Sequence, residues 1–342
     1  MNTLDTPSLE RIRRRCARVI GAALIVTVGV ALSTRAGSFP AYRFLVFAAF
    51  APALGAMIFA LLHRTTGGQW GDALEPILIS GANLVPWICL LLAPLVFASP
   101  PEDWPQYASR LMLLIRIALA AVIFFFLAAK LRQRATWVGP VGLIALVLTL
   151  HVLAEDWLMS LTPRWHSTGF PLVWMTGVAV TGLACAILAS EILGISPAGN
   201  GRAARALGLD WGNLLLATTL VWCYLAFTQY LIIWSGNLPR ELAWHEERSR
   251  GAWSVVPGVL AVVHFVVPLA VLLSRDFKQS KSMLTFCAAL LVGAQLLYLA
   301  WIVLPMSDAN PLATAIASVA GGAGALAFFF HGVLRSSRQA QP

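Results

Sequence analysis

Ten stretches of mostly apolar residues, each about as long as a lipid bilayer is thick, recur along this chain of 342 residues. A helix needs roughly 20 apolar residues to cross about 30 Å of hydrocarbon, and only helices or closed barrels satisfy their backbone hydrogen bonds there. We therefore predict an all-α integral membrane protein with about ten transmembrane helices. The apolar stretches centre on residues 19–32, 44–62, 77–97, 111–129, 138–153, 169–192, 213–233, 255–273, 283–304 and 312–333.

Composition excludes a single water-soluble domain. Hydrophobic residues make up 59% of the chain and charged residues 11%, and so much apolar surface cannot be buried in one soluble core. Residues 1–18 are polar and Arg-rich and lead directly into the first apolar stretch, without the cleavage site of a secretory signal. We expect a basic cytoplasmic tail at 1–18, one membrane domain at 19–334 and a cytoplasmic tail at 335–342.

The distribution of basic residues predicts the orientation of the chain. Lys and Arg near helix ends resist translocation, so the loops that hold most of them stay in the cytoplasm. The loops on the side of the N-terminus hold more than twice as many of the 24 Lys and Arg residues as the opposite loops. Both termini are therefore predicted to be cytoplasmic. The same bias accounts for the net charge of +9 without a surface for nucleic acid.

Several kinds of cofactor site lack their motifs. The five cysteines form no CxxC or CxxCH, which leaves iron–sulfur clusters and covalently attached haem without ligands. No Walker loop, dinucleotide-binding GxGxxG or HExxH motif occurs either. A b-type haem would need two histidines on facing helices, and only His151 and His264 are candidates. We therefore expect no metal and no resident cofactor.

Four blocks of sequence, in order and at sensible spacing, resemble one family of membrane proteins. They are GGQWGDALEPILISGANLVPWICLLLAPL (67–95), EDWLMSLTPRWHSTGFP (155–171), FTQYLIIWSGNLPRELAWHEERSRGAW (227–253) and HFVVPLAVLLSRDFKQSKSML (264–284). YLAWIVLP (298–305) is similar to a late helix of the same family. The patterns DWLMSL-x-P-x-W and QY-x-x-IW-x-x-N-x-P are the most specific. The family is that of the ActF-like membrane subunits, within the NrfD-like superfamily, of alternative complex III, a bacterial quinol:cytochrome c or quinol:oxidase oxidoreductase.

The resemblance implies two four-helix bundles, helices 2–5 and 6–9, flanked by helices 1 and 10. It implies a bacterial inner membrane, a complex for which quinol is the substrate, and a subunit without a redox centre of its own. The implied partners are a NrfD-like sister subunit, an iron–sulfur subunit and a multihaem cytochrome c that carries haem c, with a terminal oxidase as a further candidate. A role in proton transfer has been proposed for such subunits.

The chain departs from the family pattern at three places. Asn213 and Tyr298 stand where acidic or basic residues are common, and Arg240-Glu241 stands where the family usually has two acids. Fewer titratable groups favour a scaffolding role over a proton path.

The depth of a few polar residues identifies a candidate site. Arg116 lies about six residues from the outer end of its predicted helix, or roughly 9 Å deep at 1.5 Å per residue. His151 reaches a similar depth on the next helix, with Glu155 one turn above it on the same face. If the bundle turns them inward, they form a polar pocket in the outer leaflet. The candidate residues of this layer are Arg116, His151, Glu155, Asp156, Gln229 and Tyr230.

Such a layer has two interpretations. In the first, His151 or a carboxylate accepts a proton from a quinol hydroxyl and Tyr230 or Gln229 holds the opposite oxygen. In the second, Arg116 pairs with Glu155 or Asp156 to satisfy a buried charge and to tie two helices together; Asp156 could also cap the following loop. His264, near the bilayer midplane, is a candidate proton relay or a member of an interhelical hydrogen bond.

Three functions follow. The chain is a non-redox subunit of a quinol-oxidising respiratory complex that contributes a proton route or part of a quinone pocket; or it is a purely structural anchor of that complex. A stand-alone secondary transporter ranks last, because that class predicts a pair of broken helices at matching positions of two halves, and the sequence shows none.

Overall fold

The computed structural model describes residues 6–33, 40–97, 109–162, 165–195, 202–305 and 311–339, and every regular element in these ranges is helical. The helices are α1 (Thr6–Ser33), α2 (Pro40–Thr66), α3 (Gln69–Ala82), α4 (Val85–Leu90), η1 (Ala93–Phe97), α5 (Arg110–Arg132), α6 (Val138–Trp157), η3 (Met159–Leu161), α7 (Phe170–Ile192), α8 (Arg202–Gly236), α9 (Pro239–Arg248), η4 (Gly251–Val255), α10 (Val256–Leu260), η5 (Ala261–Val266), α11 (Val267–Leu273), α12 (Arg275–Gln279), α13 (Lys281–Val303) and α14 (Pro311–Gln339). Within the described ranges, 9 helical segments are long and apolar enough to span a bilayer. The prediction of an all-α, multi-pass membrane protein is confirmed.

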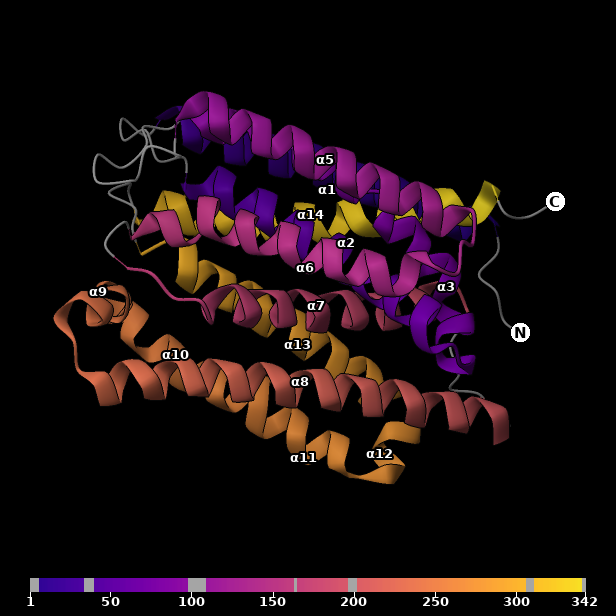
Figure 1. Ribbon diagram of the computed structural model, residues 1–342. Helices are drawn as coiled ribbons and strands as arrows, with labels where there is room; N and C mark the ends of the chain where they lie inside the picture. Colours follow the sequence, from indigo (N-terminus) through magenta and orange to yellow (C-terminus); the bar gives the residue numbers. More distant parts are fainter. Residues whose placement is uncertain are drawn as a thin grey trace.

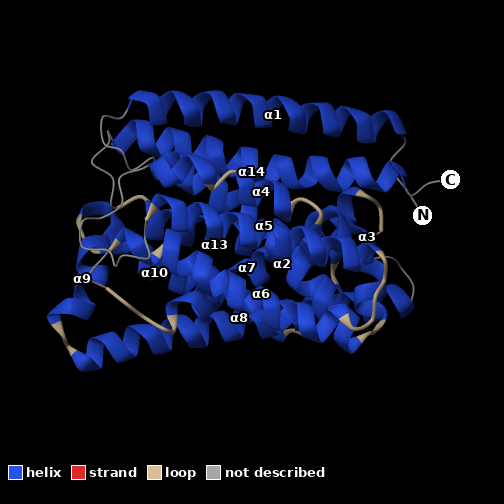
Figure 2. Ribbon diagram, turned by 45° about the horizontal axis from the view of Figure 1, so that its top comes forward, coloured by secondary structure: helices blue, strands red, loops and turns tan. Residues whose placement is uncertain are grey.

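The long helices form two bundles, as predicted (Figures 1 and 2). In the first bundle α2 packs against α3, α4 and α6, and α5 packs against α4 and α6. In the second, α7 packs against α8 and α13, and α11 lies against both α8 and α13. The two flanking helices, α1 and α14, pair with each other and lie along α2. This pair therefore covers one side of the first bundle.

The two bundles meet where α2 crosses α7. These are the most buried of the candidate spans, with 83% of each apolar window inside the protein. At the crossing a Cβ on Gly55 would clash with the backbone of Val178 and Gly182. Glycine at this point removes the side chain that would hold the two helix backbones apart, which is how small residues bring membrane helices into close contact.

Two of the spans are broken in their interior. Residues 69–97 are divided into α3, α4 and η1, and Pro86 lies in the first turn of α4. Residues 251–273 contain η4, α10, the π-helical turn η5 and α11. The interruptions occupy the second helix of one bundle and the third helix of the other. They are therefore not at matching positions, which agrees with the low rank given to a transporter.

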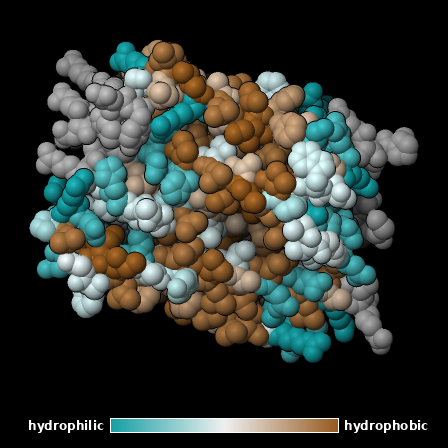
Figure 3. All heavy atoms as spheres, in the orientation of Figure 1, coloured by the Kyte–Doolittle hydropathy of each residue, from teal (hydrophilic) through white to brown (hydrophobic). Residues whose placement is uncertain are grey.

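The surface shows how the molecule sits in a membrane. In Figure 3 apolar side chains cover the middle of the visible face and polar side chains gather at its left and right ends. Many apolar residues of α5, α6 and α8 are exposed; examples are Ile115, Val147 and Phe227. The bilayer normal therefore runs along the helices. The start of α1 and the end of α14 lie at one end, here called the termini end, and α9 lies at the other, the α9 end (Figure 1).

Candidate functional site

An ion pair between Arg116 and Asp156 joins α5 to α6 toward the α9 end. Ser109 caps α5 by accepting from the backbone N–H of Met112, and this fixes the start of the helix that carries Arg116. Nη1 of Arg116 donates to Oδ1 of Asp156 at 2.5 Å. The Asp156 side chain is 1% exposed and that of Arg116 is 27% exposed. The carboxylate is thus held by the neighbouring helix, as the salt-bridge interpretation predicts.

His151 and Glu155 form a separate pair, one turn apart on α6. Nε2 of His151 lies 3.3 Å from Oε1 of Glu155, and the two side chains are 36% and 42% exposed. They therefore lie on the surface of the first bundle, outside the buried contact between Arg116 and Asp156. A base on an open helix surface lacks the enclosure that holds a substrate in a reacting geometry.

Tyr230 and Gln229 lie in another part of the molecule. Both are on α8, which Figure 1 places on the opposite side of the molecule from α5. The Tyr230 ring is 50% exposed and makes an edge-to-face contact with His245 of α9 at 5.7 Å between centroids. The expected layer of six residues is therefore not one pocket. It divides into an ion pair, a surface pair and an aromatic contact at the base of α9.

His264 lies in the interior of the second bundle, within the π-helical turn η5. Such turns are rare and occur frequently at functional sites. The His264 side chain is fully buried, and Nε2 of Gln295 on α13 donates to its Nε2 at 2.6 Å. An amide N–H donates only to an unprotonated ring nitrogen, so the imidazole carries its proton on Nδ1. Among the described residues this Nδ1 has no hydrogen-bond partner.

Aromatic rings and a small cavity surround the His264–Gln295 pair. The Trp222 ring lies over His264 at 3.9 Å between centroids and meets Tyr298 edge-on at 5.1 Å. A Cβ on Gly177 would lie 2.7 Å from Oε1 of Gln295, so glycine provides the space for the amide. A cavity of about 20 Å³ is lined by Gln295, Tyr298 and Gly177, among others. This volume holds about one water molecule. The two histidines considered for haem lie in different bundles, and each has its own partner.

A buried arginine on α9, which the sequence does not single out, anchors the α9 end. Arg248 is fully buried and lies over the Trp244 ring at 4.0 Å. Its Nη1 donates to the carbonyl of Trp244 and to Oγ1 of Thr162, and its Nη2 donates to the carbonyl of Ile302. Nε1 of Trp301 donates to the carbonyl of Arg248 at 3.2 Å. Arg248 therefore ties α9 to α13 and to the segment after α6.

Stacked aromatic rings complete this anchor. Trp165 stacks on Trp244 at 4.9 Å, and Phe170 meets Trp244 edge-on at 5.8 Å. Burial and the nearby charge of Arg248 lower the pKa of His245 to about 4, so its imidazole is neutral at pH 7. Burial also lowers the pKa of Arg248. Trp165 and Trp244 thus form a buried core, although tryptophans near membrane boundaries usually belong to an exposed aromatic belt. The only sequence signal was the density of Trp between residues 234 and 253.

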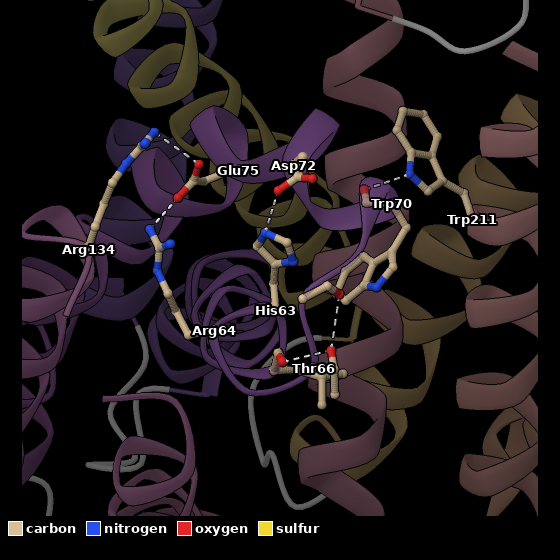
Figure 4. A network of polar contacts seen from close by, with 10 residues as sticks. His63, Arg64, Thr66, Trp70, Asp72, Glu75, Arg134 and Trp211 are labelled. Atoms are coloured by element: carbon tan, nitrogen blue, oxygen red, sulfur yellow. Dashed lines mark hydrogen bonds and ion pairs between the residues drawn. The ribbon is translucent and has the colours of Figure 1, made fainter. Parts of the chain in front are cut away.

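The termini end carries a polar network of a different kind (Figure 4). Arg64 at the end of α2 pairs with Glu75 on α3, and Arg134 donates to the other oxygen of the same carboxylate at 3.1 Å. His63 is buried and its Nε2 lies 3.1 Å from Oδ1 of Asp72, whose side chain is 70% exposed. Glu75 therefore joins α2, α3 and the turn after α5, and Asp72 places a carboxylate in contact with the solvent next to a buried imidazole.

No protein-family model matches this chain, and a search of curated proteins finds no match either.

Proposed function

We propose that this chain is a non-redox membrane subunit of a quinol:electron-acceptor oxidoreductase of the respiratory chain, of the kind found in alternative complex III. The sequence blocks that resemble the ActF-like membrane subunits support this proposal. The arrangement of two bundles with two flanking helices is also the one that the resemblance implies. The partners are then a sister membrane subunit, iron–sulfur and multihaem cytochrome c subunits, and a terminal oxidase as a further candidate. The chain lies in a bacterial inner membrane with both termini in the cytoplasm.

Within this complex, His264 is the residue proposed to transfer protons. The supporting observation is a fully buried imidazole in a π-helical turn, with one nitrogen bonded to Gln295 and the other without a partner among the described residues. Ionisable residues inside membrane spans are costly and usually functional. With its proton on Nδ1, the neutral imidazole can accept a second proton only at Nε2, so the Gln295 amide must turn away from Nε2 before Nδ1 releases its own proton. Between exchanges Gln295 would hold the ring in one orientation.

The test uses the intact complex, purified in a mild detergent through a tag on this chain. Subunits that purify with the chain are identified by mass spectrometry, and the absorption spectrum reports haem c. We expect a multihaem cytochrome and an iron–sulfur subunit in the preparation. A colourless chain that purifies alone would refute the assignment to this complex.

His264→Gln and Gln295→Leu then test the proton role in membrane vesicles. We expect both variants to assemble and to release fewer protons for each electron that reaches the acceptor. The control is His151→Gln, which replaces an imidazole on the surface of α6 and leaves the buried pair intact. Unchanged proton release in an assembled His264→Gln complex would contradict the proton role.

The second candidate is a purely structural anchor of the same complex. It is favoured by the Arg116–Asp156 pair and by Arg248, because each uses a buried charge to join helices. If Arg116→Leu and His264→Gln both abolish assembly, the anchor becomes the better description. A quinone pocket built from Arg116, His151 and Tyr230 is the weaker proposal, since the structure distributes these residues over separate sites.

A further inference from the structure

An open-sided cavity of about 590 Å³ lies at the termini end, between the start of α3 and one face of α8. Gly68, Gln69 and Trp70 form one wall. Asp210, Asn213, Leu214 and Ala217 form the other. Nε1 of Trp211 donates to the carbonyl of Trp70 at 3.0 Å and holds the two walls together. The His63–Asp72 and Arg64–Glu75 contacts belong to α2 and α3 and lie outside the lining of this cavity.

The polarity of the cavity changes along α8. Asp210 and Asn213, nearer the start of the helix, are exposed polar residues, whereas Leu214 and Ala217 are apolar. The same face of the helix continues at the 3–4-residue spacing to Val221 and Tyr224, which are 48% and 67% exposed. The site is therefore polar at its mouth and apolar for several turns toward the membrane interior. A molecule with a polar head and a long apolar chain has this distribution.

The charges at the mouth select the headgroup. Lys278 of α12 lays its stem against Gly212, and its Nζ donates to Oδ1 of Asn213 at 2.7 Å. A cation is thus held at Asn213, which lies one helical turn from Asp210 on α8. Trp70 also lines this part of the cavity. An anionic headgroup would meet Lys278 but would be repelled by Asp210. A headgroup with one phosphate and one ammonium satisfies both.

We propose that this cavity binds a zwitterionic phospholipid of the phosphatidylethanolamine class, with its phosphate at Lys278 and Asn213, its ammonium at Asp210 and Trp70, and an acyl chain along Leu214, Ala217 and Val221. An ethanolamine ammonium donates hydrogen bonds to a carboxylate, whereas a choline headgroup has no N–H to donate. The proposal is independent of the proton role of His264 and of the identity of the complex.

Lipid retention provides the test. The full-length protein, alone or in whatever complex it forms, is incorporated in nanodiscs that contain equal amounts of phosphatidylethanolamine, phosphatidylcholine and phosphatidylglycerol. It is then extracted in mild detergent, and the lipids that remain bound are quantified by mass spectrometry. We expect phosphatidylethanolamine to be enriched over the other two, and free phosphoethanolamine not to displace it, because the acyl chain contributes to binding.

Three variants make the result specific. Asp210→Asn should reduce the preference over phosphatidylcholine by about fivefold, the effect of one lost interfacial ion pair. Ala217→Phe should abolish retention by filling the apolar part of the cavity. Asp276→Asn, a matched charge change on α12, should leave retention unchanged. Equal retention of the three lipids, or unchanged retention in a folded Ala217→Phe protein, would overturn the proposal; preferential retention of phosphatidylglycerol would replace it with an anionic-lipid site.

Discussion

Replacing Arg116 by Leu should destabilise the protein more than replacing its partner Asp156. The two side chains differ in exposure, 27% for Arg116 and 1% for Asp156. Without Arg116 the carboxylate stays buried and loses its paired charge. Without Asp156, the long side chain of Arg116 can still extend toward the headgroup region, because its charged end is partly exposed. The two single variants should therefore differ in stability, although both break the same contact.

The magnitudes follow from this asymmetry. Removing one partner of a buried ion pair costs about 3–5 kcal/mol. The partial exposure of Arg116 places the Arg116→Leu variant at the lower end, at about 3 kcal/mol. The Asp156→Leu variant should lose about 1 kcal/mol, because the arginine can be resolvated. The double variant replaces the pair by apolar groups and should resemble Asp156→Leu, which gives a coupling energy of about 3 kcal/mol.

Equilibrium unfolding in mixed micelles, followed by Trp fluorescence, measures these values in the isolated chain. Arg110→Leu is the matched control, since Arg110 is exposed at the first position of the same helix, and it should change stability by less than about 0.5 kcal/mol. If the effects of Arg116→Leu and Asp156→Leu are equal and additive, the pair carries no buried coupling. The reasoning from side-chain exposure would then be refuted.

Two further predictions concern the α9 end and the bundle interface. The pKa of His245 is lowered to about 4 in the folded protein from an ordinary value of 6.5. Between these pH values the unfolded chain therefore binds more protons than the folded protein. The free energy of unfolding should fall by about 1 kcal/mol or more as the pH drops through this window. His245→Gln should remove this part of the pH dependence, which thermal unfolding at pH 7 and pH 4.5 would detect; an unchanged pH profile in the variant would contradict it. Gly55→Leu should prevent the close approach of α2 and α7 and cost more than about 3 kcal/mol, whereas Gly21→Leu, at a position with open space around it, should be tolerated. Equal melting temperatures of the two glycine variants would argue against a tight crossing.

The sequence predicted the fold well because hydrophobicity alone determines which segments can cross a membrane. Stretches such as 44–62 and 169–192 became the buried helices α2 and α7 at nearly the predicted places. The internal breaks of two spans were not predicted, since apolar residues on both sides of Asn83 and His264 conceal them. Hydropathy measures the free energy of placing a residue in lipid. It contains no information on whether the helix is α, 3-10 or π at that residue.

The candidate site was predicted less well, because depth along the bilayer is only one of three coordinates. Arg116, His151 and Tyr230 lie in candidate membrane spans toward the α9 end, but rotation about each helix axis directs them to different neighbours. The pairing of Arg116 with Asp156 was among the alternatives considered. Arg248 falls between the predicted spans 213–233 and 255–273, and its burial could not be predicted because it depends on rings from distant segments, such as Trp301.

The positions of the polar groups along the bilayer normal limit any proton route through this chain. His63 lies near the termini end, His264 near the middle and Arg248 at the α9 end, and many fully buried apolar residues, such as Phe50, fill the interior. The cavity beside Gln295 holds about one water molecule, which is too little to connect His264 to either surface. Proton transfer through His264 therefore requires that water penetrate the second bundle during turnover. Such hydration would be detected as faster hydrogen exchange of the η5 backbone amides in the active complex than in the resting one, and equal exchange rates would favour the structural role.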